Sequence, residues 1–280
     1  MPTWRAASPA PPWAARAVRF AFYGALAYAL ICLALWFGQE HLIFRSTALP
    51  ADHRYKLPAD VHEGWFEVPG ARLNTLHLRL PRPDGVVFYL HGNAGNLQTW
   101  FFDVDFYRRL NMDFFMLDYR GYGKSSGSVE SQAQLEADVR AAWDAVAPRY
   151  AGLRRVVFGR SLGSGLAAIL SAEVQPEQTV LVSAYESLQA LSAEIYPWLP
   201  RSLLRYPLRT DEALARIEGP VLIVHGMHDT VIPAAHSQRL QSRAPGAVLL
   251  LLPEAGHGDV HRFEAYRQAV RRALAPQRAP

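Results

Sequence analysis

The sequence is nearly free of cysteine. Cys32 is the single cysteine in 280 residues, so no disulfide can form within the chain, and cysteine usage does not indicate a compartment. The histidines are scattered and no cysteine pair accompanies them, so the sequence predicts neither a metal site nor a cofactor. Lysine and arginine exceed aspartate and glutamate by only four (29 against 25), without a basic block interleaved with aromatic residues. We therefore expect no nucleic-acid partner, and a solvated basic surface that suits anionic lipid headgroups.

The long apolar run of the chain lies near its amino terminus. Residues 20–38 are 19 residues without a charge, and a helix rising about 1.5 Å per residue would match the thickness of a bilayer core. A signal peptide is the alternative, but its candidate cleavage signal, Ala27-Tyr28-Ala29, lies inside the run and precedes further apolar residues. The sequence therefore favours an uncleaved single-pass anchor, with Tyr23 and Trp36 at the membrane interfaces.

The charges beside this run bear on its orientation. The amino terminus and three arginines precede it, and three basic residues follow it. The extra amine favours an amino terminus inside the cell, which places the rest of the chain outside the cytoplasm. The basic residues are Arg5, Arg16 and Arg19 before the run, and Arg45, Arg54 and Lys56 after it.

The chain beyond the anchor has the length of one large domain. If residues 1–44 form the tail and anchor, residues 45–280 remain. Alternating hydrophobicity at 63–69 and 73–80 predicts antiparallel strands, after which apolar runs alternate with helical stretches. This predicts an α/β fold with a mostly parallel, doubly wound sheet. Residues 185–218, rich in Leu, Pro and aromatic residues, predict a short lid whose side chains either contact a greasy substrate or pack onto the sheet.

A G-R-S-L-G motif at residues 159–163 is the first feature that suggests chemistry. It follows a short apolar run and precedes an Ala- and Leu-rich helical stretch. A G-x-S-x-G at such a strand-to-helix turn exposes the serine hydroxyl, since small flanking residues let the backbone pack closely. Ser161 is therefore the predicted nucleophile.

The same spacing occurs a second time, as G-K-S-S-G at residues 123–127. Its upstream strand ends several residues earlier and a polar stretch follows, so we interpret Ser125 as a loop serine. The segment also resembles part of a phosphate loop, but the first glycine of that motif would fall at Asp118. A nucleotide site is therefore not predicted.

A nucleophilic serine needs a base and an acid that orients the base. Asp229 follows the apolar strand at 220–226, and His257 follows the last apolar run at 247–252, so Ser161, Asp229 and His257 occur in the order of an α/β-hydrolase. The weaker alternatives are His225 and His228 as the base and Glu254 and Asp259 as the acid. His261 is expected to be exposed at the start of the last helix.

The oxyanion of the reaction needs donors as well. The strand at 86–90 runs into H-G-N-A-G-N at 91–96, whose glycine-rich turn can present a backbone N–H. We assign this donor to Asn93, with Ala94 as the alternative, and the second donor to the N–H of Leu162. His91 precedes a glycine in the turn and is expected to be a structural hydrogen-bonding residue.

Taken together, five motifs in chain order resemble an α/β-hydrolase-fold serine hydrolase across most of residues 63–275. They are H-G-N-A-G-N (91–96), D-Y-R-G-Y-G-K-S (118–125), G-R-S-L-G (159–163), H-G (225–226) with Asp229, and G-H (256–257). The chain is similar to a short-lidded, membrane-anchored bacterial branch, whose eukaryotic relatives include thioesterases that remove palmitate from proteins. Q-E-H-L-I-F at 39–44 also resembles that branch. One departure is A-Y-E at 184–186, where relatives carry P-F-T or similar.

These observations predict a membrane-anchored serine hydrolase of esters or thioesters that takes a small-molecule or acylated substrate. A serine peptidase or amidase would use the same residues, and a non-catalytic protein tethered to the membrane for interactions would not need them. The sequence leaves the natural substrate and the oligomeric state open.

Overall fold

The computed structural model describes residues 12–275 and forms two compact units, one that ends at Gln39 and one that begins at Glu40. The first consists of most of helix α1 (Pro12–Ile43), which is long and apolar enough to cross a membrane. A signal sequence near an amino terminus has the same character, so the helix identifies a possible anchor and no orientation. Arg5, whose charge entered the predicted orientation, lies outside the described residues.

The second unit begins before residue 45, where sequence analysis placed the domain boundary. Glu40 accepts a hydrogen bond from the Tyr206 hydroxyl (2.8 Å) and pairs with Arg205. Phe44 is buried, and its ring meets that of Tyr206 edge-on, with 5.1 Å between centroids. The last turn of α1 therefore belongs to the larger unit.

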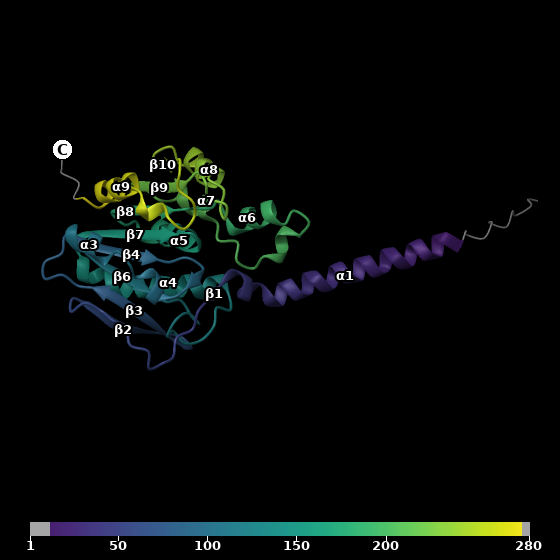
Figure 1. Cartoon of the computed structure of the whole chain (residues 1–280), viewed down its shortest axis with the longest axis horizontal. Helices are drawn as coiled ribbons and strands as arrows, with labels where there is room; N and C mark the ends of the chain where they lie inside the picture. Colours follow the sequence, from purple (N-terminus) through teal and green to yellow (C-terminus); the bar gives the residue numbers. More distant parts are fainter. Residues whose placement is uncertain (1–11, 276–280) are drawn as a thin grey trace, which may run out of the picture. The chain divides into compact units, whose positions relative to one another are not determined.

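An eight-stranded sheet runs through the larger unit in the order β2-β3-β6-β4-β7-β8-β9-β10, which the labels of Figure 1 follow from bottom to top. Strand β3 is antiparallel to β2 and β6, and the other neighbours are parallel, so the mostly parallel sheet is confirmed. The strands are β2 (Val61–Val68), β3 (Ala71–Leu78), β4 (Gly85–Leu90), β6 (Met112–Leu117), β7 (Arg154–Arg160), β8 (Gln178–Val182), β9 (Val221–Gly226) and β10 (Val248–Leu252). Two short strands, β1 (Arg45–Ser46) and β5 (Ala94–Gly95), pair in parallel beside it.

Helices cover both faces of this sheet. The α-helices are α2 (Leu97–Trp100), α3 (Val104–Arg109), α4 (Gln132–Val146), α5 (Leu162–Val174), α6 (Leu188–Ile195), α7 (Thr210–Leu214), α8 (Ala235–Arg243) and α9 (Glu264–Leu274), and the 3₁₀ turns are η1 (Ala147–Tyr150), η2 (Arg201–Leu203) and η3 (Val260–Arg262).

The hydrophobic core has two layers because successive residues of a strand point to opposite faces. In β4, Val86, Phe88 and Leu90 join a buried cluster with residues of α4 and α5. Val87 and Tyr89 join a second cluster with residues of α3 and α9. The near-continuous apolar sequence of the central strands follows from this double burial.

The segment predicted as a lid, residues 185–218, contains α6, η2 and α7 between β8 and β9. Its first residue, Tyr185, donates a hydrogen bond to the Leu162 carbonyl oxygen (2.9 Å). Three of its apolar side chains are about half exposed, namely Ile195, Tyr196 and Trp198. The segment therefore has one end fixed at the start of α5 and exposes several apolar side chains to water.

Candidate active site

Ser161 occupies the sharp turn between β7 and α5. Its backbone has φ 54° and ψ −123°, in the left-handed half of conformational space that a serine rarely adopts. A Cβ atom on Gly159 would lie 2.2 Å from the Gly163 carbonyl oxygen, and one on Gly163 would lie 2.1 Å from that of Leu90. Both flanking glycines are therefore required, because any side chain would push α5 away from the sheet.

The structure brings the three predicted catalytic side chains into one hydrogen-bonded series. The Ser161 hydroxyl lies 3.0 Å from Nε2 of His257, and Nδ1 of His257 lies 2.7 Å from Oδ2 of Asp229. The Asp229 side chain is fully buried, whereas that of His257 is 23% exposed. With Nδ1–H donated to the carboxylate, Nε2 is the nitrogen that accepts a proton from the serine.

Contacts from its own loop hold Asp229 as a carboxylate. Oδ1 accepts hydrogen bonds from the N–H groups of Val231 (2.9 Å) and Ile232 (2.8 Å). Burial alone would raise the pKa of Asp229, but hydrogen bonds from His225, His257 and the Ile232 N–H outweigh it and hold this pKa well below its ordinary value. Of the two histidine contacts, that with His257 is the shorter, 2.7 Å against 3.3 Å for His225.

His225, weighed in the sequence as an alternative base, lies behind the acid. It is fully buried, and its Nδ1 lies 2.6 Å from the Ser237 hydroxyl and its Nε2 2.8 Å from the Ile232 carbonyl oxygen. Both ring nitrogens of His225 are therefore engaged in hydrogen bonds with Ser237 and Ile232. His228, the other alternative, is exposed on the same loop.

The turn after β4 is held through its carbonyl groups. The Tyr119 hydroxyl donates to the His91 carbonyl oxygen (2.9 Å), and the Tyr122 hydroxyl donates to that of Asn93 (2.8 Å). Both tyrosines come from the D-Y-R-G-Y-G segment. The two hydroxyl groups therefore fix the carbonyl groups of His91 and Asn93.

The turn lies beside the serine. A Cβ atom on Gly92 would be 3.4 Å from the Ser161 Cβ. Among the hydrogen bonds of residues 12–275, neither the Asn93 N–H nor the Leu162 N–H serves as a donor. Ala94, the alternative donor, belongs to β5, which pairs with β1. Asn93 and Leu162 therefore remain the predicted oxyanion donors.

Arg160 is a feature of the site that sequence analysis missed. This buried arginine donates from Nη2 to the His257 carbonyl oxygen (2.9 Å), and its guanidinium lies 5.5 Å from the Trp100 ring. It holds the histidine loop from the position directly before the nucleophile. Its sequence signal is a charge that follows the apolar run Val156-Val157-Phe158.

Three other residues considered in the sequence, His91, Asp259 and His261, make contacts that support the fold. His91 is fully buried, with Nδ1 2.7 Å from the Gly92 carbonyl oxygen, as expected of a structural residue. Asp259 accepts a hydrogen bond from the Gly256 N–H (2.8 Å) and thereby shapes the histidine loop. The expectation for His261 is wrong: it is half-buried in η3, because it packs 4.8 Å from the Phe102 ring, and burial and Arg160 lower its pKa to about 4.

Ser125 is placed as a loop serine. Its hydroxyl donates to the Asp118 carbonyl oxygen (2.8 Å) and accepts from the Asn74 N–H (2.8 Å). Both functions of the hydroxyl are thus used to join β3 to the turn after β6, and no base is needed to explain it.

Among the described residues, one group has the composition of a metal site. Ligand atoms of Glu186, Glu194 and His236 lie within 4.8 Å of one another. Arg239, however, pairs with both carboxylates and lies 3.1 Å from Nδ1 of His236, while Arg243 pairs with Glu186 (3.2 Å). Two guanidinium groups therefore balance these carboxylates, and the Glu186 of the unusual A-Y-E segment ties the lid to α8.

Comparison with known proteins identifies the family of the chain. A family model described as serine aminopeptidase, S33, matches residues 81–208. The chain is 31% identical over 214 residues to α/β hydrolase domain-containing protein 17B of Xenopus laevis, covering 74% of this chain and 73% of that protein. It is also 31% identical over 255 residues to an uncharacterized protein of Mycobacterium tuberculosis, covering 87% and 90%.

Solved structures share the fold at lower identity. An esterase of Pyrococcus furiosus superposes with a TM-score of 0.64 at 19% identity, covering 81% of this chain and 98% of that one. Mouse α/β hydrolase domain-containing protein 10 superposes with a TM-score of 0.57 at 18% identity, covering 76% and 96%. The resemblance found in the sequence is thus confirmed: this chain belongs to the α/β-hydrolase superfamily and is a hydrolase of that family.

Proposed function

We propose that this protein is a serine hydrolase that cleaves carboxylic esters or thioesters through an acyl-enzyme intermediate. The observation that carries the proposal is the unbroken series from the Ser161 hydroxyl through His257 to the buried Asp229, with contacts of 3.0 and 2.7 Å. This arrangement supplies a nucleophile, a base and a fixed negative charge behind the base.

The reaction follows from the roles of these groups. The Ser161 Oγ attacks the acyl carbon while Nε2 of His257 takes its proton, and the N–H groups of Asn93 and Leu162 stabilise the oxyanion. His257 then returns the proton to the departing alcohol or thiol, which leaves an acyl-serine. Water attacks this ester with His257 again acting as base, and Ser161 is regenerated. Asp229 stays ionised throughout, consistent with its lowered pKa.

The apolar surface near the site supports an apolar acyl group. Met227 and Val231, two residues on either side of Asp229, are 54% and 53% exposed. The segment predicted as a lid exposes three further apolar side chains, Ile195, Tyr196 and Trp198. Large apolar side chains that remain in contact with water favour an acyl substrate over a polar one.

The anchor is part of the proposal. We assign α1 as an uncleaved membrane helix and the hydrolase unit to the non-cytoplasmic side, supported by the charge-free run and the flanking charges. A carboxyl-terminal fusion to a reporter active only outside the cytoplasm tests the orientation. A silent fusion that is expressed in full would reverse it.

Peptide-bond cleavage is the second candidate, because the matching family model describes a serine aminopeptidase. A substrate panel separates the two. Purified full-length protein in a non-ionic detergent is given p-nitrophenyl esters from acetate to palmitate, acyl thioesters, and aminoacyl p-nitroanilides, alongside Ser161→Ala and Ser125→Ala. We expect turnover of esters or thioesters that Ser161→Ala abolishes and Ser125→Ala retains. Turnover of the anilides alone would establish the peptidase, and no serine-dependent turnover would favour a non-catalytic protein.

A further inference from the structure

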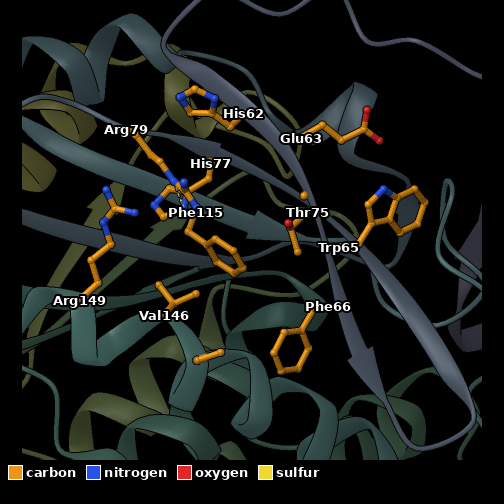
Figure 2. Close-up of a pocket in the computed structure, with 12 residues that line it drawn as sticks. His62, Glu63, Trp65, Phe66, Thr75, His77, Arg79, Phe115, Val146 and Arg149 are labelled. Carbon is orange, nitrogen blue, oxygen red and sulfur yellow. Dashed lines mark hydrogen bonds between the residues drawn. The ribbon is translucent and has the colours of Figure 1, made fainter.

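A cavity of about 490 Å³ lies on the β2–β3 hairpin. Its floor is one face of the sheet, where directly paired residues share a side: His62 pairs with His77, which in turn pairs with Phe115. In the next row, Gly64 pairs with Thr75. Gly64 has no side chain and that of Thr75 is small, so the sheet surface is hollowed at this row. Its wall is formed by the end of α4 and η1 (Figure 2).

The basic side chains of the cavity gather in one part of it. In Figure 2, His62, Arg79, His77 and Arg149 occupy one side of the view, and Phe66 and Trp65 the other. Arg79 and Arg149 are exposed, and within residues 12–275 no carboxylate pairs with either of them at salt-bridge distance. Two guanidinium groups therefore line the cavity without a direct ion pair.

A chain of hydrogen bonds holds Arg79 in place. Its Nε–H donates to Nδ1 of His77 (3.3 Å), and Nε2–H of His77 donates to the Tyr150 hydroxyl (2.8 Å), which donates to Oδ2 of Asp113 (2.6 Å). Every donor in this series has one acceptor only if the His77 ring is neutral. Burial, Arg79, Arg149 and His62 lower the pKa of His77 to about 3, which agrees with a neutral ring. The series uses Nε of Arg79 and leaves its two terminal nitrogens available.

The cavity also offers an apolar surface next to these charges. Phe115 is buried in its floor, Phe66 lies further along the same face, and Val146 contributes to the wall. A guanidinium fork beside aromatic rings binds a carboxylate or phosphate group through two parallel hydrogen bonds, while the rings contact the body of the ligand.

We propose that this cavity is a second, non-catalytic binding site for a small organic anion, a carboxylate or phosphate group on a flat apolar body. The anionic group binds between Arg79 and Arg149, and the apolar body lies against Phe66, Phe115 and Val146. The site is separate from Ser161, which follows the carboxyl end of β7, because Arg79 follows the carboxyl end of the antiparallel β3 and so lies at the opposite edge of the sheet. It does not depend on the proposed hydrolase activity.

Isothermal titration of the full-length protein in non-ionic detergent tests this site. Phenyl phosphate and benzoate probe the two anionic groups, and inorganic phosphate probes the charge without the apolar body. Saturable binding of one aromatic anion is expected, weakened about tenfold or more by Arg79→Gln combined with Arg149→Gln, since two charge-assisted hydrogen-bonding groups are lost. The better probe identifies the anionic group.

The matched control is Arg271→Gln combined with Arg272→Gln, which removes the same charge from two exposed arginines of α9. Its affinity for the probe should equal that of the unaltered protein. Equal weakening by both double variants, or no saturable binding of either aromatic anion, would overturn the site. Inorganic phosphate binding as tightly as phenyl phosphate would overturn the apolar contact. Benzoate bound as a product near Ser161 would be unaffected by Arg79 and Arg149, so it cannot imitate the expected result.

Discussion

Two segments of the chain share the G-x-S-x-G spacing, residues 123–127 and residues 159–163, and their central serines are equally buried, each 7% exposed. Ser161 has a positive φ of 54°, lies between a strand and a helix, and has its hydroxyl 3.0 Å from a histidine. Ser125 is not among the described non-glycine residues with positive φ, and its hydroxyl bonds to two backbone groups. Neither spacing nor burial separates the two serines, which differ instead in backbone conformation and in the partner of the hydroxyl.

The two segments are also connected. Tyr122, directly before the first glycine of the 123–127 copy, donates its hydroxyl to the Asn93 carbonyl oxygen (2.8 Å) in the predicted oxyanion turn. The tyrosine that precedes the 123–127 segment thus supports the site to which the 159–163 segment contributes the nucleophile. A motif that carries no chemistry can therefore still affect the reaction through its neighbours.

Ser161→Ala should have the largest effect on the reaction. Removal of the nucleophile is expected to lower kcat by about four to six powers of ten, because only the oxyanion donors and substrate binding remain. Steady-state hydrolysis of the best p-nitrophenyl ester measures this, and the melting temperature checks that the fold is retained. A variant with full activity would remove Ser161 from the mechanism.

Asp229→Asn should have the next largest effect. The amide keeps the shape of the side chain but cannot hold Nδ1–H of His257 as a charge would, so kcat should fall by about four powers of ten. The same assay measures the change, with Asp259→Asn as the control acid on the histidine loop. A larger loss for Asp259→Asn would exchange the roles of the two carboxylates.

The lowered pKa of Asp229 also predicts how stability changes with acid. Because the folded-state value lies below the unfolded one, the stabilisation is complete above about pH 4 and is lost as pH falls towards the folded-state value. The stability advantage of the unaltered protein over Asp229→Asn should therefore shrink by about 2 kcal/mol between pH 5 and pH 2. Urea unfolding of both proteins across this range measures it. An advantage that grows in acid would contradict the direction of the pKa shift.

Tyr122→Phe tests the connection between the two segments. Loss of the hydroxyl frees the Asn93 carbonyl group, so the oxyanion turn should become less ordered and kcat should fall about tenfold, with KM nearly constant. Tyr55→Phe is a suitable control, since its hydroxyl donates to the Asn74 side chain (2.9 Å) away from the turn. Equal effects of both variants on kcat would indicate a general loss of stability.

Much of this comparison was predictable from the sequence. The alternating segments predicted at 63–69 and 73–80 appear as β2 and β3, each beginning two residues earlier (61 against 63, 71 against 73). The order of Ser161, Asp229 and His257 predicted which loops meet, because parallel strands bring their carboxyl ends to one edge of the sheet. Local pattern and topology were sufficient for these features.

Contacts between distant side chains were not predictable in this way. Arg160 binds the carbonyl group of His257, 97 residues later, and no periodicity or spacing indicates that pair. The contact between Ser237 and His225 behind the acid and the cluster around Glu186 are of the same kind. Each depends on rotamers and on the packing of helices, which the fold determines only after the strands are in place.

Ser125→Ala should have the smallest effect on the reaction and a clear effect on the fold. The hydroxyl does not contact the candidate site, so kcat should stay within about twofold of its original value, as for substitutions away from the reacting groups. Its loss leaves the buried Asn74 N–H and Asp118 carbonyl group without this partner, which should lower the free energy of unfolding by about 1 to 3 kcal/mol. Urea unfolding and the ester assay measure both quantities, and Ser126→Ala, whose hydroxyl accepts from the Arg72 N–H (2.8 Å) at a more exposed position, should cost less stability. If Ser125→Ala abolished turnover in a fully folded protein, Ser125 would be needed for the reaction, and the partner of the hydroxyl would not distinguish the two serines.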